Sequence, residues 1–301
     1  MQYYVMILIA VVLLALQFST NKFYQLCFGN TVTTSLLFTA LNGLVTALLF
    51  FCINGFHLAV TPYSLFMGTV IAVLCCSYTL IGFRMLALGN MSVYTMFLML
   101  GGMLLPYLYG VVCLEESMSV WRILGVILLA VSMVFPVLGA RDDESKKKTR
   151  TLFLLLCLVV FTLNGFVSIA SKMHQISHRL IVGETDFVVL SNGLNGLIST
   201  AALFVMCVTR KTAPLSQPLT GKSMGLIAGI VCASAACNGT SYLLQLIGAA
   251  NVPASVLYPL VTGGMMVLSA VAGIIFFREI PDRKTAVGLI LSFAATFLFL
   301  F

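Results

Sequence analysis

The sequence has few charged residues for its length. Asp, Glu, Lys and Arg make up only 8% of the 301 residues, whereas about 25% is usual in soluble domains. Hydrophobic residues make up 60%, against roughly 45–50% in soluble domains. Because so few charges cannot cover a water-facing surface, the composition excludes a soluble globular protein and predicts a chain solvated by lipid.

Acidic residues are missing from the middle of the long apolar runs. All nine lie in connections or at the ends of these runs. A pump that exchanges protons for organic cations normally needs a carboxylate at mid-membrane, because that group can bind either a proton or a cation. Organic-cation antiport of this kind is therefore disfavoured.

Groups for enzyme or metal chemistry are also scarce. The chain has three histidines and no HExxH, GxSxG, DxD or Walker pattern. The nine cysteines form no CxxC pair and almost all lie within apolar runs, so we interpret them as small buried hydrophobic residues without disulfides. We therefore expect no enzyme, no metal and no cofactor.

Long apolar runs are what the sequence does contain. A bilayer core about 30 Å thick needs around 20 apolar residues in a helix, and backbone amides in hydrocarbon have no partner outside such a helix. The chain is therefore expected to be an all-α integral membrane protein of the cell membrane, with ten transmembrane helices. The ten runs span residues 3–20, 32–53, 64–86, 91–113, 120–139, 151–172, 186–208, 222–247, 252–277 and 284–301.

The basic residues predict the orientation of the chain. Thirteen of the sixteen Lys and Arg residues lie in odd-numbered connections, and only Arg122, Lys172 and Arg179 lie in even-numbered ones. Because short cytoplasmic loops retain basic residues, this bias places the odd connections in the cytoplasm and both termini outside. The bias also accounts for the net charge of +7, so no nucleic-acid partner is expected.

A few ionisable residues lie close to the ends of the runs. We expect Lys22, Arg84 and Lys172 to extend toward the lipid headgroups, since long basic side chains can place their charge in the interface. His174 and His178 are expected to be solvated in a short connection.

The two halves of the chain resemble each other. The stretch Asn21-Lys22 with Gln25 recurs as Ser171-Lys172 with Gln175, and the stretch 41–44 (Leu-Asn-Gly-Leu) recurs at 194–197. Further pairs, all 163 residues apart, are Gly101 with Gly264, Gly110 with Gly273, Glu116 with Glu279 and Gly125 with Gly288. Because each half holds five spans, units 1–140 and 151–301, joined by the charged linker 141–150, are expected to form two inverted repeats.

Two of these stretches resemble a known family. The stretch 106–116 followed by Gly125, and the stretch 273–279 followed by Gly288, are similar to the glycine, short spacer and acidic residue at the ends of spans four and nine in the EamA-like family of the drug/metabolite transporter (DMT) superfamily. The resemblance implies ten helices in two inverted repeats around a central cavity lined by spans one, three, four, six, eight and nine. It also implies cytoplasmic termini, opposite to the orientation that the basic residues favour.

Polar side chains gather on the spans that would form the interface between the repeats. Because polar groups are costly in hydrocarbon, we expect them to face a cavity or a neighbouring helix. The candidate substrate-binding residues are Gln17, Asn21, Ser77, Tyr78, Tyr94, Asn164, Ser168, Asn238, Tyr242, Tyr258 and Thr262. Asn42 and Asn195, which precede glycine at the same place in both repeats, favour hydrogen bonding between helices instead.

Glycine and proline interrupt spans four and nine. The residues concerned are Gly101, Gly102, Pro106, Pro259, Gly263 and Gly264. They would either weaken these helices near mid-membrane and act as hinges, or let neighbouring helices pack closely, and the sequence leaves both alternatives open.

Together these features predict a secondary transporter. The Asn, Gln, Ser, Thr and Tyr side chains fit a small neutral or zwitterionic solute, such as an amino acid, moved by alternating access. One alternative is a quaternary amine held in a cage of tyrosine rings, and another is a channel or scaffold that does not transport. Coupling to a proton or another ion, and a monomeric or homodimeric state, are left open.

Overall fold

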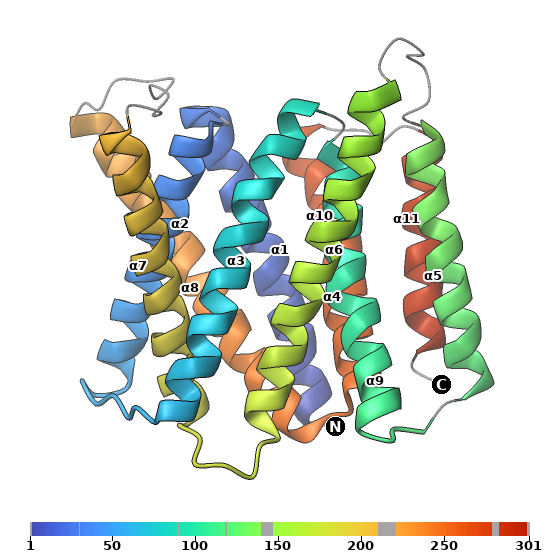
Figure 1. Ribbon diagram of the computed structural model, residues 1–301, viewed down its shortest axis with the longest axis horizontal. Coiled ribbons are helices and arrows are strands. Elements are labelled where there is room, and N and C mark those ends of the chain that lie inside the picture. The colour runs from blue at the N-terminus through green and yellow to red at the C-terminus, as the bar shows by residue number, and fades with distance from the viewer. Residues whose placement is uncertain are drawn as a thin grey trace.

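The computed structural model is a bundle of helices (Figure 1). It describes residues 2–29, 31–88, 91–117, 119–139, 147–209, 221–278 and 283–299, and none of these residues lies in a strand. The helices are α1 (Gln2–Phe28), α2 (Val32–Ile53), α3 (Pro62–Leu88), α4 (Met91–Cys113), α5 (Val120–Gly139), α6 (Lys147–Gln175), α7 (Glu184–Val208), α8 (Gly221–Asn251), α9 (Ala254–Tyr258), the π-helix η2 (Pro259–Gly263), α10 (Gly264–Phe277) and α11 (Arg283–Leu298).

The apolar runs coincide with these helices. Within the described ranges, eight helical segments are long and apolar enough to cross a membrane, one of them being the continuous series Ala254–Phe277. The other two helices, α5 and α11, contain the shorter apolar stretches Val120–Ser132 and Ala286–Leu298. The prediction of an all-α, multi-pass membrane protein is therefore confirmed.

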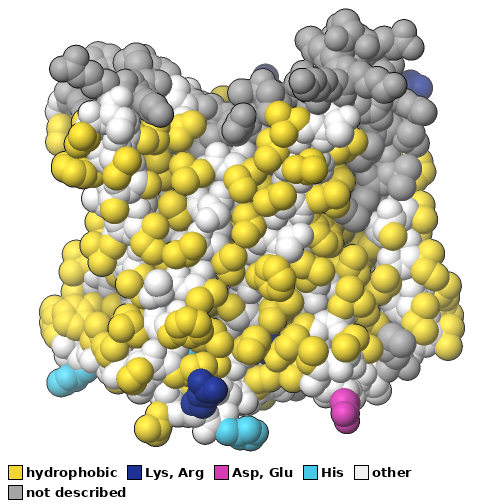
Figure 2. Space-filling view, viewed as in Figure 1, with side chains coloured by type: hydrophobic (Ala, Val, Ile, Leu, Met, Phe, Trp, Pro, Cys, Tyr) yellow, Lys and Arg dark blue, Asp and Glu magenta, His cyan; other side chains and the backbone are white. Residues whose placement is uncertain are grey.

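Apolar side chains cover the outside of the bundle. Leu48, Val112 and Phe204 are 62%, 74% and 68% exposed. In Figure 2 hydrophobic side chains fill the middle of the visible face, and the visible basic, acidic and histidine side chains lie at its upper and lower edges. An apolar surface of this extent is stable in lipid and not in water.

The cysteines only partly follow the prediction. All nine are free, as expected, but burial holds only for Cys76 and Cys157. The exposed cysteines are Cys52, Cys113, Cys207 and Cys232. The expectation of burial was wrong for these four, because in lipid an apolar side chain has no need to be covered by protein.

Helices from the two halves of the chain pack against each other. Helix α1 packs against α8, α3 against α6, α2 against α7, and α5 against α11. The α2–α7 crossing is close, because a Cβ atom added to Gly43 would lie 2.8 Å from the backbone nitrogen of Gly196. Such a backbone approach needs a residue without a side chain on both helices.

The bundle has two ends, named here from Figure 1. The lower end is where α1 begins and α11 ends, and the connection 176–183 between α6 and α7 also lies there (Figure 1). The upper end is where α1 ends and α6 begins (Figure 1). Helices α1 and α6 therefore run in opposite senses.

Candidate functional site

A cavity of about 930 Å³ lies between the two halves of the bundle. Its described lining residues come from every helix except α5, and α11 contributes Leu289. Small-molecule sites are usually roughly 300–1,000 Å³ in volume, so this cavity can enclose a metabolite.

One wall of the cavity carries amide and hydroxyl groups. Helices α2, α7 and α8 supply this wall, and its polar residues are Ser35, Thr39, Asn42, Ser191, Asn192, Asn195, Asn238, Tyr242 and Gln245. Amide groups offer both hydrogen-bond donors and acceptors without adding a charge. This wall is therefore suited to polar solutes that carry both kinds of group.

The wall on the side of α4 and α10 is mainly apolar. Its apolar residues include Met96, Leu98, Met99, Val261, Met265, Met266 and Ala270, with Leu14 and Phe18 from α1, and its hydroxyl groups are those of Thr262 and Ser269. Methionine side chains are flexible and polarizable, so they can adjust to apolar groups of different shape. The cavity thus has a polar wall and an adaptable apolar wall.

Hydrogen bonds involve asparagines of four helices, α1, α2, α7 and α8. The amide of Asn42 donates to Ser234 Oγ at 2.6 Å, and Ser234 donates to Asn21 Oδ1 at 3.1 Å. The amide of Asn238 donates to Asn192 Oδ1 at 3.2 Å. Interhelical bonding is therefore confirmed for Asn42.

Asn195, which precedes glycine in the stretch 194–197 as Asn42 does in the stretch 41–44, behaves differently. Its Oδ1 atom is buried and accepts no hydrogen bond from the described residues. Both asparagines thus line the cavity. Asn42 bonds to Ser234 of a neighbouring helix, whereas the Asn195 side-chain oxygen makes no such bond within the described residues.

Two tyrosines lie at the lower part of the cavity. The Tyr258 hydroxyl donates to the Ser168 carbonyl oxygen at 2.7 Å, and the Tyr242 hydroxyl lies 3.2 Å from Ser171 Oγ. Both contacts join the second-half helices α8 and α9 to α6. They hold the phenol rings in fixed positions along the cavity wall.

Most of the candidate substrate-binding residues come together in this cavity. Nine of the eleven line it: Gln17, Asn21, Tyr78, Asn164, Ser168, Asn238, Tyr242, Tyr258 and Thr262. Ser77 is not among the lining residues, and its hydroxyl donates to the Val73 carbonyl of its own helix at 2.7 Å. The side chain of Tyr94 lies outside the described residues.

In α4 the glycines permit close packing. A Cβ atom on Gly101 would collide with the carbonyl oxygen of Phe161, and one on Gly102 would lie 2.6 Å from the Asn164 amide nitrogen. This approach lets the Asn164 amide donate to the Leu98 carbonyl at 2.7 Å. Helix α4 continues unbroken through Pro106. In the first half, the geometry thus fits close packing of neighbouring helices better than a hinge within α4.

In the second half the helix is interrupted. Residues from Pro259 to Gly263 form the π-helix η2 between α9 and α10. Proline has no N–H to donate to the helical ladder, and π-helix occurs mostly as single-turn interruptions inside α-helices. The Thr262 hydroxyl donates to the Tyr258 carbonyl at 2.6 Å. The helical series of span nine is therefore interrupted at these residues, and a Cβ atom added to Gly264 would lie 3.0 Å from Val11 Cγ1.

The expectation that Lys172 reaches the headgroups was wrong. This side chain is only 4% exposed, and its Nζ atom donates to the carbonyl oxygens of Ala249 at 2.6 Å and Val252 at 2.8 Å. Helix α6 continues to Gln175, so Lys172 faces the end of α8 inside the bundle. The carbonyls at a helix C-terminus are good partners for a cation.

The other described ionisable residues near span ends have three different surroundings: His174 is buried, His178 is exposed and Lys22 lines the cavity. His174 is fully buried, contrary to expectation: its ring stacks on Phe187 with centroids 3.6 Å apart, and its Nε2 atom lies 2.8 Å from Ser64 Oγ. His178 is exposed, as expected. Lys22 lines the cavity, with Nζ 4.7 Å from the centroid of the Phe277 ring.

The side chain of Arg84 lies outside the described residues. Among the described residues that line the cavity, Lys22 is the only Lys, Arg, His, Asp or Glu. The described part of the chain also contains no group of three His, Cys, Asp or Glu residues placed to hold a metal ion. The polarity of the described cavity wall is thus mainly that of uncharged groups.

The cavity is not centred in the bundle. It extends to Lys22, Gln25 and Phe277, which lie toward the upper end. On the lower side its last lining residues are Ser171, Ala249 and Tyr258, and beyond them α6, α8 and α9 meet. The cavity therefore extends toward one end of the bundle and stops short of the other.

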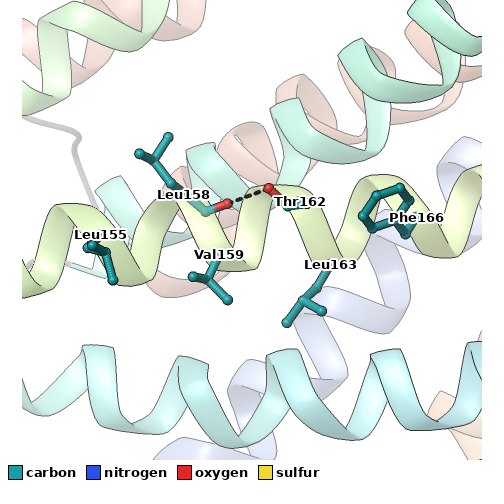
Figure 3. Close-up of a pocket in the computed structure, with 6 residues that line it drawn as sticks. All are labelled: Leu155, Leu158, Val159, Thr162, Leu163 and Phe166. Carbon is teal, nitrogen blue, oxygen red and sulfur yellow. Dashed lines mark hydrogen bonds between the residues drawn. The ribbon is translucent and has the colours of Figure 1, made fainter.

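A smaller groove of about 290 Å³ lies on the outer face of α6 (Figure 3). Leu155 and Leu158, two of the residues that line it, are each 56% exposed. The hydroxyl of Thr162 donates to the Leu158 carbonyl at 2.9 Å within the helix (Figure 3). Because the groove offers a polar solute no unbonded side-chain donor, it is not a candidate for the functional site.

Sequence reasoning missed part of the cavity wall. Met96, Met99, Met265 and Met266 were not candidates, because an apolar residue that faces a cavity has the same character as one that faces lipid. Asn192 was also missed, although a second asparagine within the span 186–208 was a usable signal of an inward-facing position.

Comparison with known proteins shows only the fold. No family model matches the chain, and no curated protein matches it. A solved structure described as "Crystal structure of protein" is similar over 99% of this chain and 96% of that chain, with a TM-score of 0.70 and 15% sequence identity. At this identity the likeness extends to the arrangement of the helices and not to activity.

Proposed function

We propose that the protein is a secondary transporter that moves a small neutral or zwitterionic metabolite by alternating access. The observation that carries this proposal is the cavity between the two halves, which extends toward the upper end and stops short of the lower end. A site that can be reached from one side at a time is the requirement for this mechanism.

The pairing of helices supports an inverted repeat. If α1 to α5 correspond to α6, α7, α8, the α9–α10 series and α11, exchanging the halves turns the α1–α8 contact into the α6–α3 contact. Both contacts are present, as are the α2–α8 and α7–α3 contacts that form a second such pair. The α2–α7 and α5–α11 contacts turn into themselves under the same exchange.

Individual contacts support the same correspondence. The contact between Gly101 and Phe161 has its counterpart in the contact between Gly264 and Val11, with each residue at the offset seen in the sequence. Gly43 and Gly196, which occupy equivalent positions in the two repeats, pack against each other. This is the arrangement that an approximate two-fold axis through the α2–α7 crossing produces.

The two walls of the cavity indicate the character of the solute. The polar end would meet the amides of Asn192 and Asn238, and an apolar part would meet Met99 and Met266. Because no carboxylate lies among the described lining residues, an uncharged or zwitterionic solute with an apolar side group, such as an amino acid, fits better than an organic cation.

Orientation and family are part of the same proposal. The odd-numbered connections, which carry most of the basic residues, follow or precede helix ends that lie at the upper end of the bundle, such as the end of α1 and the start of α6 (Figure 1), so the charge bias favours a cavity that extends toward the cytoplasm. Membership of the EamA-like family rests on the resemblance of the sequence motifs, which the ten-helix arrangement supports.

The proposal is tested by binding and by counterflow. Purified protein would be screened for thermal stabilisation by neutral amino acids, with choline as the comparison, and the best ligand would be tested for counterflow in proteoliposomes. We expect saturable counterflow. Asn238→Ala should weaken binding roughly 2- to 10-fold, which corresponds to one lost hydrogen bond. Ser77→Ala, outside the cavity lining, should leave binding unchanged.

Other outcomes contradict the proposal in defined ways. Flux that grows linearly with concentration and shows no counterflow indicates a channel. Stabilisation by choline and not by amino acids indicates the aromatic-cage alternative. Binding without any flux in sealed, correctly reconstituted vesicles excludes a transporter.

A further inference from the structure

Two charged residues act on the short junction between α8 and α9. Lys172 of α6 donates to the carbonyl oxygens of Ala249 and Val252, at the end of α8. The carboxylate of Glu116, just after α4, accepts hydrogen bonds from the backbone N–H groups of Ala254 at 2.7 Å and Ser255 at 2.8 Å, at the start of α9. A cation thus meets free carbonyls and an anion meets free amides.

The surroundings of Glu116 are built for this contact. The chain folds back so that the Glu116 N–H donates to the Gly110 carbonyl at 3.1 Å. A Cβ atom on Gly110 would lie 2.8 Å from Glu116 Oε2 and 3.1 Å from the Ala254 Cβ atom. Glycine at position 110 is therefore what leaves room for the carboxylate. Arg122 adds a hydrogen bond from Nη1 to Ser255 Oγ at 3.2 Å.

These contacts lie directly beyond the closed end of the cavity. Ser171, Ala249 and Tyr258 are the last lining residues on this side. Lys172 follows Ser171 in the chain, and its acceptor Ala249 is itself a lining residue. An opening toward the lower end between α6 and the α8–α9 junction would break the Lys172 bonds, and one between α4 and α9 would break the Glu116 bonds.

The repeat counterparts at the other end have different surroundings. Lys22, the counterpart of Lys172, lines the cavity over the ring of Phe277. Gly273, the counterpart of Gly110, also lines the cavity, and a Cβ atom there would meet none of the described residues within 4 Å. Gly110 and Lys172 are thus packed against protein at the lower end, whereas their counterparts Gly273 and Lys22 face the cavity toward the upper end.

We propose that Glu116 and Lys172 form a clamp on the α8–α9 junction, residues 249–255, that holds the lower end of the cavity closed and releases when that end opens. The clamp makes both residues positioning residues for transport: they set which side the cavity faces and do not bind the solute. The inference rests on the proposed alternating access, but its test needs no knowledge of the solute.

The test uses Cys75, a native cysteine that lines the cavity. The full-length chain, with its other eight cysteines replaced by alanine, would be labelled with a membrane-impermeant maleimide in right-side-out and in inside-out vesicles. The starting protein should label from one side only. Lys172→Met and Glu116→Gln should each allow labelling from the other side as well, at least tenfold faster than in the starting protein.

Matched variants separate release of the clamp from general damage. Gly110→Ala displaces the Glu116 carboxylate without removing a charge and should act like Glu116→Gln, whereas Gly273→Ala should not. Glu115→Gln changes an exposed carboxylate next to Glu116 and should leave labelling one-sided. Lys172→Arg keeps a cation at the end of α8 and should restore at least part of the closure.

The outcomes decide the clamp independently of transport. If Lys172→Met and Glu116→Gln lower the thermal stability but labelling stays one-sided, the contacts are merely structural and the clamp is refuted. If these variants do not fold, Gly110→Ala against Gly273→Ala decides by the same readout. Two-sided labelling in a protein that moves no solute would retain the clamp and refute the proposed function.

Discussion

Substituting Gly43 by alanine should force helices α2 and α7 apart. The added Cβ atom would lie 2.7 Å from the Asn192 carbonyl oxygen, and 2.8 and 2.9 Å from the backbone nitrogen and Cα of Gly196. All three are backbone atoms, so no side-chain rotation relieves the contact. The helices must separate by roughly 0.5–1 Å to restore ordinary contact distances. Overpacking of this kind typically costs about 1–3 kcal/mol.

A second glycine, at a position where an added Cβ atom meets none of the described atoms, serves as the control. It separates the cost of the steric contact from the gain in helix propensity that alanine brings. Alanine gains about 1 kcal/mol over glycine in a helix interior. Gly229 of α8 receives the same gain, and its Cβ position has nothing described within 4 Å. The free energy of unfolding of Gly43→Ala should therefore be about 1–3 kcal/mol below that of Gly229→Ala.

The assay is denaturation of the purified protein in mixed detergent micelles, followed by circular dichroism. Gly196→Ala should behave like Gly43→Ala, and the double variant should cost less than the sum of the two, because both press on one crossing. Equal stability of Gly43→Ala and Gly229→Ala would show that α2 and α7 do not approach as closely as the structure has them.

Two further predictions concern buried polar contacts. His174→Ala should lower the free energy of unfolding by about 2–5 kcal/mol, because it removes a fully buried ring stacked on Phe187, whereas His178→Ala, at an exposed position, should change it by less than about 0.5 kcal/mol. The buried Ser132 and Ser292 hydroxyls lie 2.8 Å apart between α5 and α11. Replacing both by alanine should cost no more than Ser132→Ala alone, because that replacement leaves the buried Ser292 hydroxyl without its acceptor, whereas Ser132 also donates to the Leu129 carbonyl at 2.7 Å. Each set is measured in the same unfolding assay, and additive losses for the serine pair would contradict the contact.

The positions of the helices were predictable because lipid imposes a minimum apolar length. The ends of the helices were not. The apolar run 151–172 predicts where α6 lies, but the helix continues to Gln175. Its last turn is polar, and it is stabilised by bonds that no local pattern reveals, such as that of Lys172 with α8. The interpretation of Lys172 as a headgroup-facing residue failed for this reason.

The polar part of the candidate site was predictable for a similar physical reason. An amide within an apolar run is costly unless it faces other polar groups, so Asn164 and Asn238 were assigned inward and do line the cavity. The same logic gives no information on methionine, which costs nothing in lipid or in a cavity. The role of Ser77 was mistaken for another reason: a serine can satisfy its hydroxyl on its own helix, here at the Val73 carbonyl.

Sequence repeats alone cannot tell which end of such a protein is closed. Lys22 and Lys172 lie in matching stretches of the sequence, yet Lys22 lines the cavity and Lys172 is buried at the α8–α9 junction. In the proposed mechanism the two repeats exchange these environments, so most bonds that break at one end are replaced by equivalent bonds at the other. The free-energy difference between the two states then arises only where the halves differ. Asn21 and Ser171 are such a pair: Asn21 accepts from Ser234 at 3.1 Å, whereas Ser171 contacts the Tyr242 hydroxyl at 3.2 Å. Unmatched positions of this kind, and not the shared motifs, would set the side that the empty cavity faces.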